Sequence, residues 1–167
     1  MLGLCLGLAA CGFRPLYGRD VSGAASPVAL ELAAIAVAPV EAAPLDRRLG
    51  QVLRNELLEL VNPRGEPATA RYDLSIRLAT DRAALAIAAD DTITRYNVIL
   101  DAAVLLAERA SGAPVHETTV RAVGSYDVQV SDYGTLIAER ATREDTARDL
   151  ARRIAAVLAA ILAQRAS

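Results

Sequence analysis

Cys11 is the residue whose neighbours predict a definite chemistry. Residues 2–10 carry no charge, consist of Leu, Gly and Ala apart from Cys5, and end in Leu-Ala-Ala. A run of this length matches the apolar core of a secretory signal. Small residues before a cysteine are what a lipoprotein signal peptidase recognises. We therefore predict that residues 1–10 form a lipoprotein signal segment and that Cys11 becomes the lipid-bearing first residue of the mature chain.

The predicted signal departs from the usual pattern at its start. Secretory signals open with a positively charged segment and span about 15–30 residues, whereas residues 1–10 contain no Arg. We therefore expect that the start codon has been assigned too late and that a basic stretch is missing. The alternative is an ordinary buried strand or helix with two free thiols. Gly3 and Gly7 disfavour the helix, and the lack of alternation disfavours the strand.

The other reactive side chains do not predict catalysis. His116 is the single His of the chain and has no Ser or Cys partner in a recognisable arrangement. Asp90-Asp91 could form a carboxylate pair or half of a Ca²⁺ site, but adjacent Asp residues also occur in plain turns. Ser125-Tyr126-Asp127 lacks a base, and one His with two Cys is too few for a zinc site. We predict no catalytic residues, no metal and no cofactor, and hence a protein that is not an enzyme.

Three arginines are the candidate binding residues. The alternation of the predicted strands places Arg77, Arg95 and Arg121 on the sheet face that no predicted helix covers. Each guanidinium can bind two oxygens of one phosphate group, so three on one surface would suit a phosphate-bearing ligand. The alternative is that they are solvated side chains that pair with the nearby carboxylates of Asp73, Asp101 and Asp127. The sequence leaves both interpretations open.

Composition limits the class of protein. The chain has 167 residues, of which 53% are apolar and 23% charged, as in ordinary single-domain globular proteins. No uninterrupted apolar run approaches the roughly 20 residues that a membrane-spanning helix needs. Its 18 basic residues, all Arg, face 20 acidic ones, which gives a net charge of −2. Such a balance predicts no general attraction to nucleic acid.

The chain divides into three segments. Residues 1–10 are the predicted signal, residues 11–27 a lipidated and Gly-, Ser- and Pro-rich tether, and residues 28–167 a single domain. The tether contains Phe13, Leu16 and Tyr17. These side chains could dock on a partner or a lipid interface, or pack on the surface of the domain itself.

Periodicity predicts the order of the elements. Alternation around Ile35 and Val37 indicates a first strand over 31–40, stopped by Pro39. A helix opened by Pro44 and Asp46 follows and ends at 62–65. Three strands are predicted next, over 72–87, 92–108 and 115–130. Apolar residues three and four apart give the first helix one stripe, made of Leu45, Leu49, Val52, Leu53, Leu57, Leu60 and Val61.

A long final helix is predicted from about Asp132 to Gln164. Its apolar stripe starts at Tyr133, Leu136 and Ile137, and Thr142 to Asp145 could fray or bend. The end of the helix is apolar nearly all round, so it must be well buried or contact a partner. A sheet with one apolar face needs helices to cover it. We predict an α+β two-layer sandwich, with a mainly antiparallel four-stranded sheet and two helices on one face.

The N-terminal segment resembles a known family. Residues 8–18, LAACGFRPLYG, are similar to the start of the lipopolysaccharide-assembly lipoproteins (LptE), in which Gly-Phe and a Pro-Leu-Tyr-like turn follow the lipid-bearing Cys. The end of the chain is similar to the alphaproteobacterial branch of that family, and the order of elements agrees over essentially all of the mature chain. That similarity lies in Ser125-Tyr126-Asp127, in Tyr133-Gly134-Thr135-Leu136 and in the helix over 138–153.

The resemblance implies a location, partners and a role. Family members sit in the outer membrane, plug the lumen of the large β-barrel LptD, help that barrel to fold, and with it deliver lipopolysaccharide to the outer leaflet. Some bind lipopolysaccharide through basic residues, which do not match this chain one by one, so Arg77, Arg95 and Arg121 stay a prediction from the residues. Cys11 carries over directly. Gly12 fits outer-membrane sorting, because a retaining Asp after the Cys is absent.

Two other classes of protein are alternatives. An auxiliary lipoprotein of a periplasmic ABC transport system also places a small α+β domain on a lipid anchor, and an anchored envelope enzyme would need a catalytic constellation. The Gly-Phe-Arg-Pro-Leu-Tyr segment after Cys11 favours the assembly lipoprotein over the transport lipoprotein. The absence of a visible nucleophile, base or metal set disfavours the enzyme.

Overall fold

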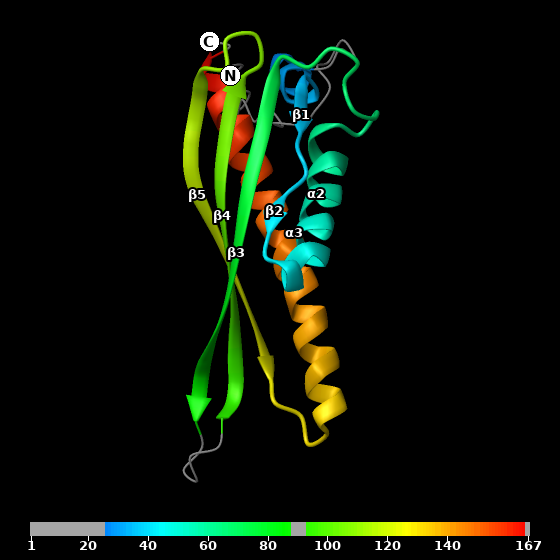
Figure 1. The fold of residues 1–167 in the computed structure, drawn as a ribbon, viewed down its shortest axis with the longest axis vertical. Helices are drawn as coiled ribbons and strands as arrows, with labels where there is room; N and C mark the ends of the chain where they lie inside the picture. Colours follow the sequence, from blue (N-terminus) through cyan, green and yellow to red (C-terminus); the bar gives the residue numbers. More distant parts are fainter. Residues whose placement is uncertain (1–25, 88–92, 166–167) are drawn as a thin grey trace, which may run out of the picture.

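The computed structural model describes residues 26–87 and 93–165, which form an open sheet with helices on one side (Figure 1). The predicted α+β class and the two-layer arrangement are confirmed. In chain order the described elements are α1 (Pro27–Ala33), β1 (Ile35–Val37), β2 (Glu41–Ala42), the 3₁₀ helix η1 (Pro44–Asp46), α2 (Arg47–Val61), β3 (Tyr72–Ile87), β4 (Ile93–Glu108), β5 (Pro114–Asp127) and α3 (Asp132–Arg165).

Three long strands carry the sheet. β3 pairs antiparallel with β4, and β4 pairs antiparallel with β5. β1 and β2 are short and both pair parallel with β3, at Ile35↔Tyr72 and Glu41↔Arg77. The described sheet therefore has five strands rather than the predicted four, because β2 resumes pairing after the interruption at 38–40. β5 ends at Asp127, so the strand predicted to reach residue 130 is shorter than expected.

The start of the domain differs from the prediction. Residues 31–33, expected in the first strand, belong to α1, and only Ile35–Val37 of that segment form β1. The Ser26 hydroxyl accepts a hydrogen bond from the Ala29 amide at 3.1 Å, and Pro27 occupies the first turn. A side-chain cap with proline directly after it stabilises a helix start. This local signal prevails over the alternation that suggested a strand.

Helix α2 forms where the apolar stripe of the sequence predicted a helix. Its buried side chains recur at helical spacing along one face, and Gly65 follows the helix with a φ of 101°, a conformation that glycine adopts without strain. α2 buries Leu49, Leu53, Leu57 and Val61 in the core, where the helix contacts α3 as well as β1 and β2.

The core lies between the sheet and the helices. Even-numbered side chains of β3 and β4 point into it, including Leu74, Leu78 and Leu100. α3 is continuous through the segment predicted to bend. Its final turns contact α1 as well as the sheet and α2, so the extra helix explains why they are apolar nearly all round (Figure 1). The buried residues there are Ile154, Ala155, Leu158, Ala159 and Leu162.

α3 is much longer than the helix beside it. It has 34 residues against 15 in α2, and its first turns run past η1 toward the far end of the sheet (Figure 1). No helix within the described ranges is long and apolar enough to cross a membrane.

Candidate functional site

The uncovered face of the sheet holds all three candidate arginines. Arg77 lies on β3, Arg95 on β4 and Arg121 on β5, each at an odd-numbered position, whereas the buried residues of β3 and β4 are even-numbered. All three side chains are exposed. The predicted alternation therefore placed them on the correct face.

Each of these arginines pairs with a carboxylate. The Arg121 Nε and Nη2 atoms donate to the two Asp101 carboxylate oxygens at 2.7 and 2.9 Å, directly across the β4–β5 ladder. The Arg95 Nε donates to Asp127 at 2.6 Å, and the Arg77 Nε to Glu41 at 3.2 Å. These guanidiniums are engaged but remain accessible, so the face presents neutralised pairs rather than free cations.

Hydrogen bonding shifts the titration of these carboxylates. The Arg121 guanidinium holds the pKa of Asp101 below its ordinary value, and Arg95 does the same for the pKa of Asp127. Asp73, the third expected carboxylate, pairs with Arg109, whose Nε donates to its two oxygens at 3.0 and 3.1 Å. The ion pairs of this face therefore include Arg109, an arginine that the sequence pattern did not single out.

The three candidate arginines do not form one cluster. Arg77 pairs in register with Ala103, one two-residue step along β4 from the Asp101–Arg121 pair, so the backbones of Arg77 and Arg121 lie about 12 Å apart with β4 between them. Arg95 is six residues along the same strand from Asp101. At about 3.4 Å per residue this is a separation of about 20 Å. One small phosphate-bearing group could contact Arg77 and Arg121 together, but not Arg95 as well.

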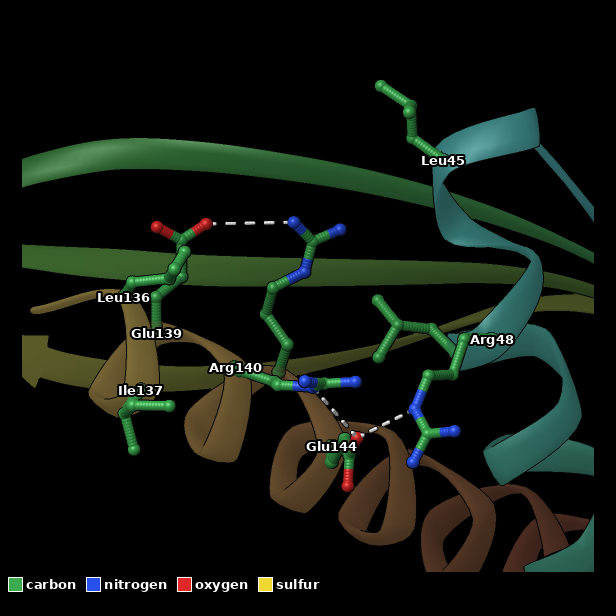
Figure 2. A pocket seen from close by; sticks show the side chains of 9 residues that line it. Leu45, Arg48, Leu136, Ile137, Glu139, Arg140 and Glu144 are labelled. Atoms are coloured by element: carbon green, nitrogen blue, oxygen red, sulfur yellow. Dashed lines mark hydrogen bonds and ion pairs between the residues drawn. The ribbon is translucent and has the colours of Figure 1, made fainter. Parts of the chain in front are cut away.

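A groove lies between two helices on the opposite layer. It has a volume of about 330 Å³ and lies between the η1–α2 start and the first turns of α3 (Figure 2). Leu45, Leu136 and Ile137 line it and are 95%, 62% and 46% exposed. Sequence periodicity placed these residues in buried stripes, and that prediction is wrong.

The lengths of the two helices explain this correction. α2 begins only at Arg47, so the first turns of α3 have no helix beside them to cover the apolar face that their spacing predicts. Tyr133, on the first turn, is exposed for the same reason. The sequence signal was available, because the helix opened by Pro44 and Asp46 is too short to run along the whole of α3.

Ion pairs line the groove. The Glu144 carboxylate lies 3.0 Å from the Arg48 Nε, 3.8 Å from the Arg140 Nε and 3.6 Å from an Arg148 nitrogen. Figure 2 shows Arg48 and Arg140 reaching the same carboxylate from different helices. These guanidiniums hold the pKa of Glu144 below its ordinary value, the Arg48 hydrogen bond most of all. Arg143 pairs with Asp46 and with Glu139.

A polar cluster joins α3 to the sheet beneath the groove. The Tyr126 hydroxyl donates to the Glu139 carboxylate at 3.0 Å, and the Tyr126 ring stacks on Tyr96 with centroids 5.7 Å apart. The Arg82 guanidinium lies 4.7 Å from the centre of the Tyr96 ring and 3.4 Å from Glu139. Burial raises the pKa of the Tyr126 hydroxyl. In this half of the molecule the two layers are therefore held by polar contacts as well as by apolar packing.

The remaining sequence candidates divide between placed and unplaced residues. His116 is half-buried on β5 opposite Leu106, and Ser125-Tyr126-Asp127 lies in β5, as its interpretation as strand required. Cys11, residues 12–25 of the predicted tether and Asp90-Asp91 lie outside the described residues, whereas Ser26 and Pro27, the last two residues of that tether, form the start of α1. Within residues 26–87 and 93–165, no three His, Cys, Asp or Glu side chains are grouped to hold a metal ion.

Solved structures share this fold. A candidate lipoprotein of Caulobacter crescentus superposes with a TM-score of 0.63 at 26% identity, covering 81% of this chain and 96% of that one. Rare lipoprotein B of Shewanella oneidensis gives 0.60 at 12% identity, covering 79% and 100%. The uncharacterized lipoprotein B of Nitrosomonas europaea gives 0.52 at 13%, covering 70% and 78%.

The chain has a fold found in bacterial lipoproteins. The rare lipoprotein B match covers all of the solved Shewanella chain, so the shared fold extends over a whole domain rather than one motif. No family model matches the chain, and no curated protein matches its sequence.

Proposed function

We propose that this chain is a non-catalytic outer-membrane lipoprotein that plugs and helps to assemble an LptD-type β-barrel, for delivery of lipopolysaccharide to the outer leaflet. The observation that supports the proposal is that one chain combines a lipoprotein-like start with a lipoprotein fold. Residues 8–18 resemble the start of the LptE family, and the domain that follows has a fold found in lipoproteins, rare lipoprotein B among them. Lipidation of Cys11 would attach that domain to the membrane.

The surface of the domain suits a polar enclosure. The lumen of an outer-membrane barrel is lined by polar side chains. The uncovered sheet face of this chain presents Arg–carboxylate pairs, and ion pairs also mark the outer side of α3, such as Arg153–Asp149 at 2.7 Å. Charge pairs on both layers are compatible with polar walls on both sides. A lipid anchor on the same chain would raise the effective concentration of the domain near its barrel.

Direct binding of lipopolysaccharide forms part of the proposal. Arg77 and Arg121 are the pair best placed to contact a phosphate group together, because their backbones lie about 12 Å apart across β4, nearer than either is to Arg95. Arg95 would need a second phosphate, at about 20 Å. A phosphate would have to compete with the carboxylates that these guanidiniums already contact.

A gentle detergent pull-down of the tagged, full-length protein tests the proposal. Its partners are identified by mass. We expect a large β-barrel in stoichiometric amount. Recovery of inner-membrane transporter subunits without a barrel would contradict the proposal and support the auxiliary transport lipoprotein.

A further inference from the structure

Five of the ten exposed large apolar side chains of the described residues lie at the groove or shortly before it in the chain, whereas the others, such as Leu30 and Val123, are spread mainly over α1 and the strands. Leu45, Leu136 and Ile137 line the groove, Tyr133 lies on the first turn of α3, and Val130 lies two residues before that helix. Soluble proteins expose isolated apolar residues routinely, but a contiguous group marks a contact surface. α2 stops short of this part of α3, so the groove is the place where the helix layer is incomplete.

The charges beside the groove favour an acidic occupant. Arg48 and Arg140 have side chains 64% and 65% exposed, whereas the Glu144 carboxylate between them is only 19% exposed. That single carboxylate serves both guanidiniums and is also contacted by Arg148. The accessible rim is therefore positive, while the negative group lies beneath it and is already engaged. A carboxylate from a partner could reach both arginines.

The position of the groove favours a protein over a lipid surface. The predicted anchor precedes α1, which contacts α3, and Glu31 of α1 lines a hollow together with Leu162 and Arg165 at the C-terminal end of α3 (Figure 1). Leu136 lies 29 residues before the end of that helix, which is about 44 Å at 1.5 Å per residue. The groove is thus far from the end of the domain where the chain enters from its anchor. A volume of about 330 Å³ also suits a few side chains.

We propose that this groove receives a segment of the barrel partner in which apolar side chains flank an Asp or Glu. The apolar groups would pack on Leu45, Leu136 and Ile137, and the carboxylate would bind Arg48 and Arg140. This inference rests on the proposed function, because it takes the barrel as the partner. It adds which surface of this chain binds the partner, and which side chains the bound segment of the partner carries.

Matched variants of the full-length protein test the inference in the native host. Arg48→Glu/Arg140→Glu reverses the rim, and Leu136→Ser/Ile137→Ser removes the apolar floor while leaving the charges. Arg64→Glu/Arg71→Glu is the control, because it changes the net charge equally at two exposed positions of the segment between α2 and β3, away from the groove. Circular dichroism checks that every variant is folded. We expect each groove variant to recover at least about tenfold less barrel than the wild type, and the control to recover within about twofold.

Photo-crosslinking identifies the occupant. The full-length variant Leu136→p-benzoylphenylalanine is irradiated in cells, and the adduct is analysed by mass. A barrel peptide that contains Asp or Glu supports the inference. An adduct with lipopolysaccharide, phospholipid or a second copy of this chain overturns it.

Two further outcomes separate this inference from the function on which it rests. If the wild type recovers the barrel and the groove variants recover it equally well, the inference fails and the proposed function stands. If the wild type recovers no barrel, the proposed function fails and the inference fails with it.

Discussion

Charge pairs on the uncovered sheet face set the behaviour of individual residues. Arg121 binds both oxygens of Asp101, and Arg95 binds Asp127 on the same ladder. Arg121→Gln should raise the pKa of Asp101 toward its ordinary value, because the guanidinium that lowers it is gone. An NMR titration of the Asp101 carboxyl measures this, with Arg95→Gln as the matched control. An Asp101 that titrates identically in wild type and Arg121→Gln would contradict the pairing.

The same pairs predict a direction for stability against pH. Asp73, Asp101 and Asp127 all have a lowered pKa in the folded chain, each mainly through a hydrogen bond from Arg. Their stabilising contribution is therefore complete above the ordinary carboxyl pKa and is lost as the pH falls through the lowered values. Urea unfolding at a series of pH values should show the free energy of unfolding falling across that acid range. Added salt should flatten the slope, because exposed pairs are screened.

The predicted lipid anchor depends on the thiol of Cys11. Cys11→Ser should abolish labelling by a palmitate analogue, and label that persists would contradict the predicted signal.

Arg77→Ser/Arg95→Ser/Arg121→Ser should weaken the binding of lipopolysaccharide to the protein and reduce the dependence of that binding on salt. Arg64→Ser/Arg152→Ser/Arg153→Ser, three exposed arginines elsewhere, is the control. Equal binding by both triple variants would place the contact on another surface.

At the scale of the elements, the contact between α3 and β5 depends on one glycine. A Cβ at Gly124 would lie 2.2 Å from the Thr146 Oγ1 and 2.9 Å from the Thr142 Cγ2. Thr146 is buried and donates to the Thr142 carbonyl at 2.6 Å, so it cannot turn away without losing that bond. Gly124→Ala should lower the free energy of unfolding by about 1–3 kcal/mol, and Thr146→Ala in the same chain should recover part of it. Chemical denaturation measures both, and additive effects would contradict the clash.

Two leucines of α3 test the division of that helix into a packed and an open part. Leu150 is fully buried, whereas Leu136 is 62% exposed in the groove. Leu150→Ala should cost about 2–5 kcal/mol of unfolding free energy, and Leu136→Ala at most about 0.5 kcal/mol. Thermal or urea unfolding of the two variants decides the matter. A large loss from Leu136→Ala would mean that the groove is part of the structural core rather than a contact surface.

Local patterns predicted most of the elements, and long-range geometry accounts for the differences. The stripe of α2, the three long strands and α3 follow from residue spacing, because those faces are buried against one layer. Spacing alone could not separate Leu136 from Leu150, since both lie on apolar faces and only the limit of α2 exposes one of them. Likewise, alternation placed Arg77, Arg95 and Arg121 on one face, whereas the distance between them depends on strand register.

At the scale of the whole molecule, the proposed function places the domain inside a barrel rather than beside one. The two layers present opposite outer surfaces, the uncovered sheet face and the solvent side of the helices (Figure 1). A plug meets a wall on both surfaces, whereas a protein docked on the rim meets its partner on one. This difference is measurable without knowing the partner's structure.

Photo-crosslinking from both surfaces of the full-length protein in its native host tests that claim most directly. The probe p-benzoylphenylalanine replaces Thr119 on the sheet face in one variant and the exposed Gln51 of α2 in another. The plug predicts adducts with the same large β-barrel from both positions. Barrel adducts from one position alone, or adducts with transporter subunits from either, would contradict it.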